Sequence, residues 1–378
     1  DFTTYLPGTA VVDGSQITAS TMNQYDGALT LQHAATANFD TIYIGFFDTN
    51  LAEITLDAST MVAANVVVGP YSSENNQLIV TNGSLLTVIN SSSSGTLEMS
   101  YGTLEFDGGT IFADNLKSAR TNAAINFSGG LMDCGSANIS NSLPFVVGNG
   151  IAEAEYHLHG GTHSFADGLH ISANASLTGN GTVIGAVTVA TGGTLSPGNS
   201  IGGITLGNSP TLQGNVTLEI SKTGMTLTND QLKVMAPLTY GGTLTVSNAG
   251  PNALAAGDSF QMFSASNYDG SFTSLYLPPL NSGLTWTNQL LVDGSIAVIA
   301  QPIPAIHLTT SSGSNLIFSV TNGSPGGAYD LLTSTNLALP LSSWITNRSG
   351  NFDSSGNQVL TNSISPNEPQ RFFLLKTP

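Results

Sequence analysis

Residues 152–159 hold the densest group of side chains that could bind a metal ion. Successive residues of a β-strand point to opposite faces. A strand here would therefore place all of its ionisable side chains on one face: Glu153, Glu155, His157 and His159. The other face would carry Ala154, Tyr156 and Leu158. His163 and His170 follow, so four of the six histidines fall within fourteen residues. Imidazole and carboxylate groups together suit a transition metal.

The spacing along one strand argues against a closed metal site. Same-face neighbours lie about 7 Å apart, which is too far for a single ion unless a neighbouring segment supplies ligands. We therefore interpret residues 153–159 as an exposed polar face above a buried Ala/Tyr/Leu face. The expectation is no cofactor and no metal requirement for folding, with weak candidate ligands at Glu153, Glu155, His157 and His159.

Other local motifs have ordinary structural interpretations. Residues 198–202 spell the G-x-S-x-G of a nucleophile elbow, but that elbow requires a helix after the serine. A short β-like run follows here, so Ser200 is expected to be a turn residue. Residues 351–357 lack the alternating carboxylates of a calcium loop and predict an Asp/Asn turn. The single cysteine, Cys134, is expected in the core. We predict no catalytic residues.

Composition points to an extracellular all-β protein. The chain has 378 residues, 42 of them glycine, and 40% hydrophobic residues. Its 8% of charged residues compares with roughly 25% in an average globular protein. The net charge of −17 opposes binding to nucleic acid or to anionic lipid headgroups. The sequence contains no run of 18 apolar residues, so it predicts no membrane-spanning helix. Because the sequence opens at Asp1, we expect a secreted product whose signal peptide has been removed.

Short alternating strands punctuated by Gly or Asn predict a β-solenoid. The unit G-x-[LIV]-x-[LIVF] recurs at intervals of roughly 10 or 20 residues, with apolar residues at every second position. Each such repeat can bury its apolar face only against its neighbours. A single solenoid over residues 8–300, with about 20–30 residues in each coil, is the simplest interpretation.

Composition changes near residue 300 suggest four segments. Two prolines within residues 301–305 predict a stiff linker. Apolar runs separated by turns in residues 306–378 predict a small C-terminal β-sandwich. Residues 1–7 are expected to form an extended, apolar N-terminal segment, ahead of the solenoid of residues 8–300.

Residues 177–185 and 192–202 resemble the autotransporter-associated β-strand repeat of bacterial cell-surface proteins. The Ser-Pro-Gly-Asn-Ser turn at residues 196–200 is the most specific element of this resemblance. The family implies a right-handed parallel β-helix of the passenger type, with adhesive or structural roles. Leu195 and Ile201, which flank the turn, are expected to point into the solenoid. The C-terminal segment is similar to β-sandwich modules of such proteins, and because no membrane barrel follows it, an export route other than self-secretion is implied.

These observations predict a non-enzymatic, self-assembling subunit of a cell-surface or matrix fibre. Copies would join head to tail through the apolar N-terminal residues Phe2, Tyr5 and Leu6. The alternative is a monomeric adhesin that binds glycan or another surface. A β-helix polysaccharide lyase or hydrolase ranks third, since Lys117 and Arg120 are the only basic residues before Lys222. Paired carboxylates from neighbouring coils would still allow a hydrolase.

Overall fold

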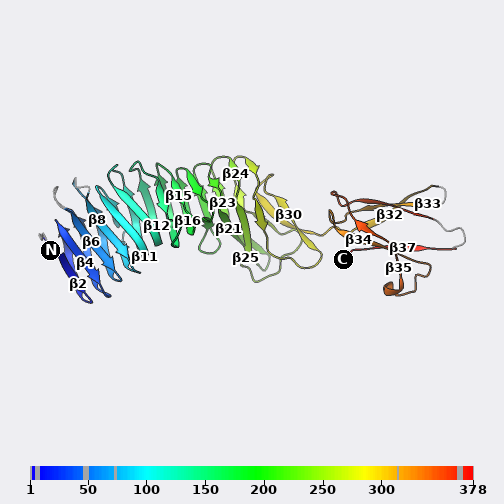
Figure 1. Cartoon of the computed structure of the whole chain (residues 1–378), viewed down its shortest axis with the longest axis horizontal. Helices are drawn as coiled ribbons and strands as arrows, with labels where there is room; N and C mark the ends of the chain where they lie inside the picture. The colour runs from blue at the N-terminus through cyan, green and yellow to red at the C-terminus, as the bar shows by residue number, and fades with distance from the viewer. Residues whose placement is uncertain are drawn as a thin grey trace. The chain divides into compact units, whose positions relative to one another are not determined.

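A computed structural model describes residues 2–4, 9–45, 51–71, 75–312, 315–363 and 369–377, without the side chains of residues 2–4 and 310–312. The chain divides into two compact units. The first comprises residues 1–282 and 286–299, and the second comprises residues 283–285 and 300–378. Figure 1 shows stacked parallel strands in the first unit and antiparallel strands in the second.

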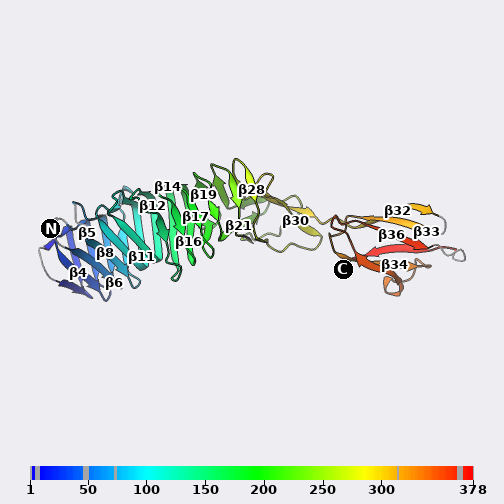
Figure 2. The ribbon, with the colours of Figure 1, turned by 45° about the horizontal axis from the view of Figure 1, so that its top comes forward.

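The first unit is a parallel β-solenoid with three ladders of strands (Figure 2). The first ladder contains β2 (Thr9–Asp13), β4 (Gly27–Gln32), β6 (Ala52–Asp57), β8 (Asn76–Thr81), the first parts of β11 (Gly102–Ser118) and β12 (Ala124–Ile139), β13 (Phe145–Val147), β15 (Leu169–Ile171), β17 (Val187–Val189) and β20 (Thr211–Leu212). β24 (Leu238–Tyr240) and β28 (Tyr268–Gly270) form a further parallel pair.

The second ladder forms the face on which residues 154–159 lie. It contains the first parts of β3 (Gln16–Gln24), β5 (Thr36–Ile44) and β7 (Thr60–Val68), then β9 (Leu85–Val88), the middle of β11 and β12, β14 (Ala154–Phe165), β16 (Ala175–Ile184), β18 (Thr194–Pro197), β21 (Asn215–Thr223), β25 (Thr243–Asn248) and β29 (Ser274–Tyr276).

The third ladder closes each turn. It contains β1 (Phe2–Thr4), the second parts of β3, β5 and β7, β10 (Thr96–Met99), the ends of β11, β12, β14 and β16, then β19 (Gly203–Leu206), β23 (Gln231–Val234) and β27 (Phe263–Ser264). β22 (Thr226–Asn229) adds an antiparallel hairpin to β21.

Alternating residues of each strand fill the solenoid interior. Leu29, Ile54, Leu78 and Leu104 pair in sequence along the first ladder and are at most 2% exposed. Their spacings of 25, 24 and 26 residues (54 − 29, 78 − 54 and 104 − 78) agree with the coil length expected from the repeats. A continuous apolar column inside a parallel solenoid is therefore confirmed.

The turn beside β18 matches the sequence-based expectation only in part. Leu195 is fully buried, as predicted. Ile201 lies in a bend outside the strands and is half-buried, so its inward orientation stays a prediction. The strand alternation ends at Pro197, and a bend does not continue the inward and outward parity of the strand before it.

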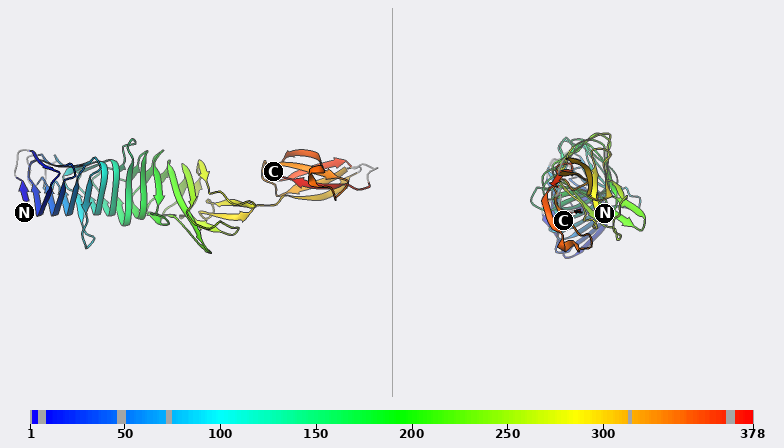
Figure 3. Two further views of the ribbon diagram at one scale, coloured as in Figure 1. Left: turned by 90° about the horizontal axis from the view of Figure 1, so that it is seen from below. Right: turned by 90° about the vertical axis from the view of Figure 1, so that its right-hand side faces the viewer.

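The two ends of the solenoid differ. At the C-terminal end, a small antiparallel sheet of β26 (Ser259–Gln261), β31 (Ser295–Ala300) and β30 (Leu284–Gln289) follows the parallel ladders (Figure 3). The carbonyl oxygen of Gly294 accepts the backbone N–H groups of Met262 and Phe263, which covers part of the last parallel edge.

The second unit is a small β-sandwich. One sheet contains β32 (Ala305–Ser312), β33 (Asn315–Thr321) and β36 (Gln358–Ser363), and the other contains β35 (Ile345–Asn351), β34 (Ala328–Ser334) and β37 (Phe372–Lys376). A shared core joins the sheets through Phe318, Val320, Tyr329, Leu331, Phe352 and Leu360. A single turn of 3-10 helix, Leu341–Ser343, precedes β35. Within the described residues, no helix has the length and apolar character needed to cross a membrane.

Candidate functional site

The histidine-rich segment forms β14, and its side chains alternate as the sequence predicted. Ala154, Tyr156 and Leu158 are buried, whereas Glu155 and His157 lie on the outer face. The side chain of His157 is 12% exposed and that of His159 is 73% exposed. The strand therefore presents one imidazole held against the surface and one that extends into solvent.

Ladder register brings residues of three turns together. Asp133 of β12 pairs with His157 of β14, and His157 pairs with Thr178 of β16. Sequence analysis did not find Asp133, because nothing in a single strand reveals which residue of the preceding turn lies beside it. The alternation of Met132, Asp133 and Cys134 is the available signal, since it places the aspartate outward between two buried residues.

Hydrogen bonds fix the orientation of His157. The Thr178 hydroxyl donates to Glu155 Oε1, and its oxygen lies 2.8 Å from His157 Nδ1. Glu155 Oε1 is itself 3.5 Å from His157 Nδ1. These contacts favour a proton on Nδ1 and leave Nε2 available. Hydrogen bonding to Glu155 raises the pKa of His157, and the same bond lowers the pKa of Glu155.

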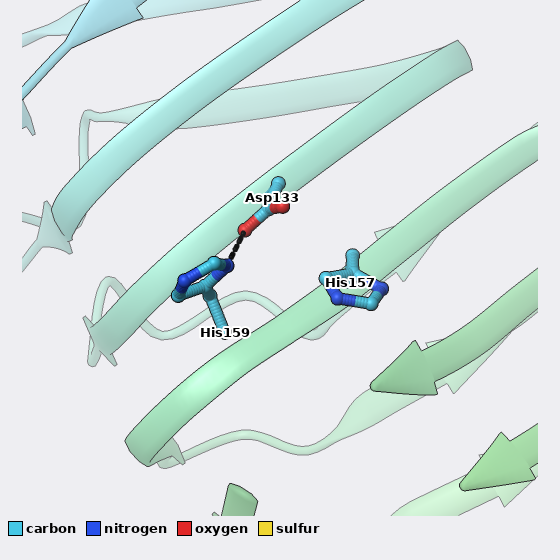
Figure 4. Close-up of side chains that lie close together, drawn as sticks. All are labelled: Asp133, His157 and His159. Carbon is cyan, nitrogen blue, oxygen red and sulfur yellow. Dashed lines mark ion pairs between the residues drawn. The ribbon is translucent and has the colours of Figure 1, made fainter. Parts of the chain in front are cut away.

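Asp133, His157 and His159 form a compact group (Figure 4). One potential ligand atom from each residue lies within 4.8 Å of the others. His159 Nδ1 is 3.3 Å from Asp133 Oδ1, and His157 lies beside this pair. Of the four sequence candidates, His157 and His159 thus lie in one cluster. Glu155 is not part of the cluster, but it contacts Nδ1 of His157. Glu153 instead lines an adjoining cavity of about 490 Å³, together with Glu155, Asn174 and Ser176.

His163 lies beneath this face and has a structural role. It is fully buried, with Nε2 2.9 Å from the Gly160 carbonyl oxygen and Nδ1 2.9 Å from the Tyr156 hydroxyl. In the neutral ring, Nε2 donates to the Gly160 carbonyl oxygen and Nδ1 accepts from the Tyr156 hydroxyl. Burial lowers the pKa of His163 accordingly. The neighbouring thiol of Cys134 is buried, as predicted, and burial raises its pKa to about 12.

The acidic residues beside the Ser-Pro-Gly-Asn-Ser turn form a structural clamp. Asp230 Oδ1 accepts the N–H of Gly202, and Oδ2 accepts the N–H of Glu219, both at 2.7 Å. Asp230 and Glu219 line a cavity of about 460 Å³ with Ser196 and Ser200. Burial raises the pKa of Asp230 to about 6, as in catalytic acids. Both of its oxygens are nevertheless engaged by backbone, which favours a clamp over a proton donor.

The remaining candidate motifs adopt turn geometry. Ser200 is exposed in a bend and is followed by β19, a strand, whereas a nucleophile elbow requires a helix at that point. Asp353 Oδ1 accepts the N–H groups of Ser355 and Asn357, both at 2.8 Å, which is an ordinary Asp turn. Both motifs agree with their sequence interpretation.

No family model matches the sequence, and a search of curated proteins finds no match. The β-solenoid that the repeat resemblance implies is present in residues 9–276.

Proposed function

We propose that the chain is a non-enzymatic, extracellular structural protein that assembles head to tail into a cell-surface or matrix fibre. Secretion with removal of a signal peptide, and a passenger-type relationship to autotransporter repeats, belong to the same proposal. The observation that carries it is the open edge of the first solenoid turn.

The first turn is incompletely buried. Within the described residues, β2 pairs only with β4, and Gln16–Ala19 of β3 pairs only with β5. The inward-facing side chains of this turn, Val12 and Ile17, are half-buried. Their partners one turn later, Leu31 and Ala37, are at most 1% exposed. An apolar interior behind backbone groups that no further described strand pairs favours the addition of another strand layer.

The opposite end of the solenoid offers an apolar surface that could receive this edge. A cavity of about 260 Å³ is lined by Tyr240, Phe272, Leu275 and Leu290. Val292 also lines this cavity and is 74% exposed. Contact between unlike ends is heterologous, and when repeated it generates an open filament rather than a closed dimer.

The assembly role of Phe2, Tyr5 and Leu6 remains a prediction. Phe2 lies in β1, whose backbone pairs with Met22–Gln24 of its own chain. Tyr5 and Leu6 lie outside the described residues. The open edge of β2 and of Gln16–Ala19 in β3 adds a second set of backbone groups through which copies could join.

Charge substitutions at this edge test the proposal. We expect Val12→Lys and Ile17→Lys to abolish concentration-dependent assembly, measured by sedimentation velocity and negative-stain imaging. Val11→Lys is the matched control, because Val11 lies on the same strand and is already 52% exposed. An intact protein that stays monomeric at every concentration would contradict fibre assembly.

A row of short polar side chains favours the adhesin alternative. Along the second ladder, register aligns half-exposed residues of successive turns: Ser176, Thr194, Asn215, Thr243 and Ser274. Neighbouring turns are about 4.8 Å apart, so this row offers regularly spaced hydrogen-bonding groups to an extended glycan. Binding to polysaccharides by the monomer, lost in Thr194→Val and Thr243→Val together, would support this function.

A further inference from the structure

We propose that the outer face of the second ladder binds one divalent transition-metal ion, best fitted by Zn²⁺, through Asp133, His157 and His159. The ion would connect β12 and β14, two successive turns of the solenoid. The proposal goes beyond a structural role for the chain and does not depend on assembly.

The donor set selects the class of metal. Two imidazoles and one carboxylate suit Zn²⁺, Cu²⁺ or Ni²⁺, whereas Ca²⁺ and Mg²⁺ prefer oxygen ligands. Ligand atoms around a tetrahedral Zn²⁺ lie about 3.4 Å apart, given bonds of about 2.1 Å. The distance of 3.3 Å between His159 Nδ1 and Asp133 Oδ1 already meets this spacing.

The third ligand needs only a small closing movement. All three ligand atoms lie within 4.8 Å of one another, so no separation must shorten by more than about 1.4 Å. His159, at 73% exposure, can adjust its position by rotating its side chain, and a small shift of the His157 or Asp133 side chain completes the approach. Asp133 and His157 are 16% and 12% exposed, and their strands pair in the ladder, so their backbone positions are held in place.

The surroundings of His157 match those of a metal-ligating histidine. Such residues usually direct their second ring nitrogen to a carboxylate or another polar partner, which fixes the tautomer. Nδ1 of His157 contacts Thr178 and Glu155, as described above. In Figure 4 the other ring nitrogen of His157 is turned toward the Asp133–His159 pair. Three ionisable side chains that only shared an exposed surface would not require the His157 ring to be oriented in this way.

Three protein ligands leave the fourth position of a tetrahedral Zn²⁺ to water or to an external group. The metal would add a bond between turns that the parallel backbone ladder already joins. Binding should therefore raise the melting temperature without being required for folding.

Titration of the EDTA-treated, dialysed protein with ZnCl₂ by isothermal calorimetry tests the site. We expect one saturable site per chain, weakened at least tenfold by His159→Ala and by Asp133→Asn. His33→Ala is the matched control. His33 Nδ1 also contacts a carboxylate, Asp13 Oδ1 at 2.7 Å, on an exposed surface. This pair belongs to no cluster of three metal-binding residues within the described part of the chain.

A second variant separates positioning from ligation. Glu155→Gln should weaken Zn²⁺ binding by about 10- to 100-fold through loss of the carboxylate charge beside His157. Co²⁺ added to this variant should still give the visible absorption of a tetrahedral complex. Circular dichroism melts of each variant verify folding. Absence of saturable binding, or equal loss in His33→Ala and His159→Ala, would overturn the proposal.

Discussion

Asp230 illustrates how one buried side chain stabilises several segments of a solenoid turn. Its carboxylate connects the bend at Gly202 to β21 at Glu219, although burial disfavours its charge. Desolvation raises its pKa to about 6 in the folded state, against 3.8 ordinarily. The folded protein therefore binds this proton more tightly than the unfolded chain does.

The raised pKa predicts a specific pH dependence of stability. The contribution of Asp230 is fully present below about pH 4 and is lost as the pH rises through about 6, because the unfolded chain releases this proton first. Urea unfolding at pH 4 and pH 7 measures it. We expect Asp230→Asn to reduce this fall in the free energy of unfolding. An unchanged fall in the variant would show that Asp230 does not cause it.

Leu195 and Thr194 give a test of side-chain parity. Leu195 is fully buried and Thr194 is half-exposed, at adjacent positions of β18. Leu195→Asp buries an unpaired carboxylate and should cost on the order of several kcal/mol of stability. Thr194→Asp should reduce the stability much less, because Thr194 is half-exposed. Thermal melts compare the two variants, and equal destabilisation would contradict the inward orientation of Leu195.

At the scale of elements, sequence periodicity predicted which residues of a strand are buried but not which strands lie side by side. The alternation in residues 153–159 gave the two faces of β14, because the period of a strand is two wherever it occurs. Asp133 was missed because the pairing of β12 with β14 depends on loop lengths and on bulges. One register shift lies between Cys134 and Ala137. The sequence therefore predicted His157 and His159 as candidate ligands but not Asp133, the third residue of the cluster.

Close approach of successive turns explains a glycine in β11. Gly109 has φ +102°, and a Cβ there would lie 2.3 Å from the Ser84 carbonyl oxygen of the preceding turn. Gly108 has a similar φ of +94°, but a Cβ there would meet nothing within 4 Å. Both substitutions with alanine carry backbone strain of about 1–2 kcal/mol, and only the substitution at Gly109 adds a clash.

We expect Gly109→Ala to lower the melting temperature clearly more than Gly108→Ala does. Differential scanning calorimetry of the two variants provides the comparison. If Gly108→Ala proves as damaging as Gly109→Ala, backbone conformation alone limits both positions, and the spacing between turns has no influence.

At the scale of the whole molecule, the broad architecture followed from composition and repeats. Few charges, abundant glycine and short alternating strands left a solenoid as the simplest fold, and the apolar runs after residue 305 form a sandwich with its own core. The difference between the solenoid ends could not be predicted. It depends on Gly294 accepting the N–H groups of Phe263 and Met262, a contact between residues about 30 apart without a repeat signature.

The central claim is that the first solenoid turn provides an assembly edge. Hydrogen–deuterium exchange of peptides covering residues 9–19, followed at low and high protein concentration, tests it most directly. We predict slower exchange at high concentration in these peptides and in those covering residues 268–276, while the interior strand Gly27–Gln32 is unchanged. Exchange in residues 9–19 that is fast and independent of concentration would contradict the account.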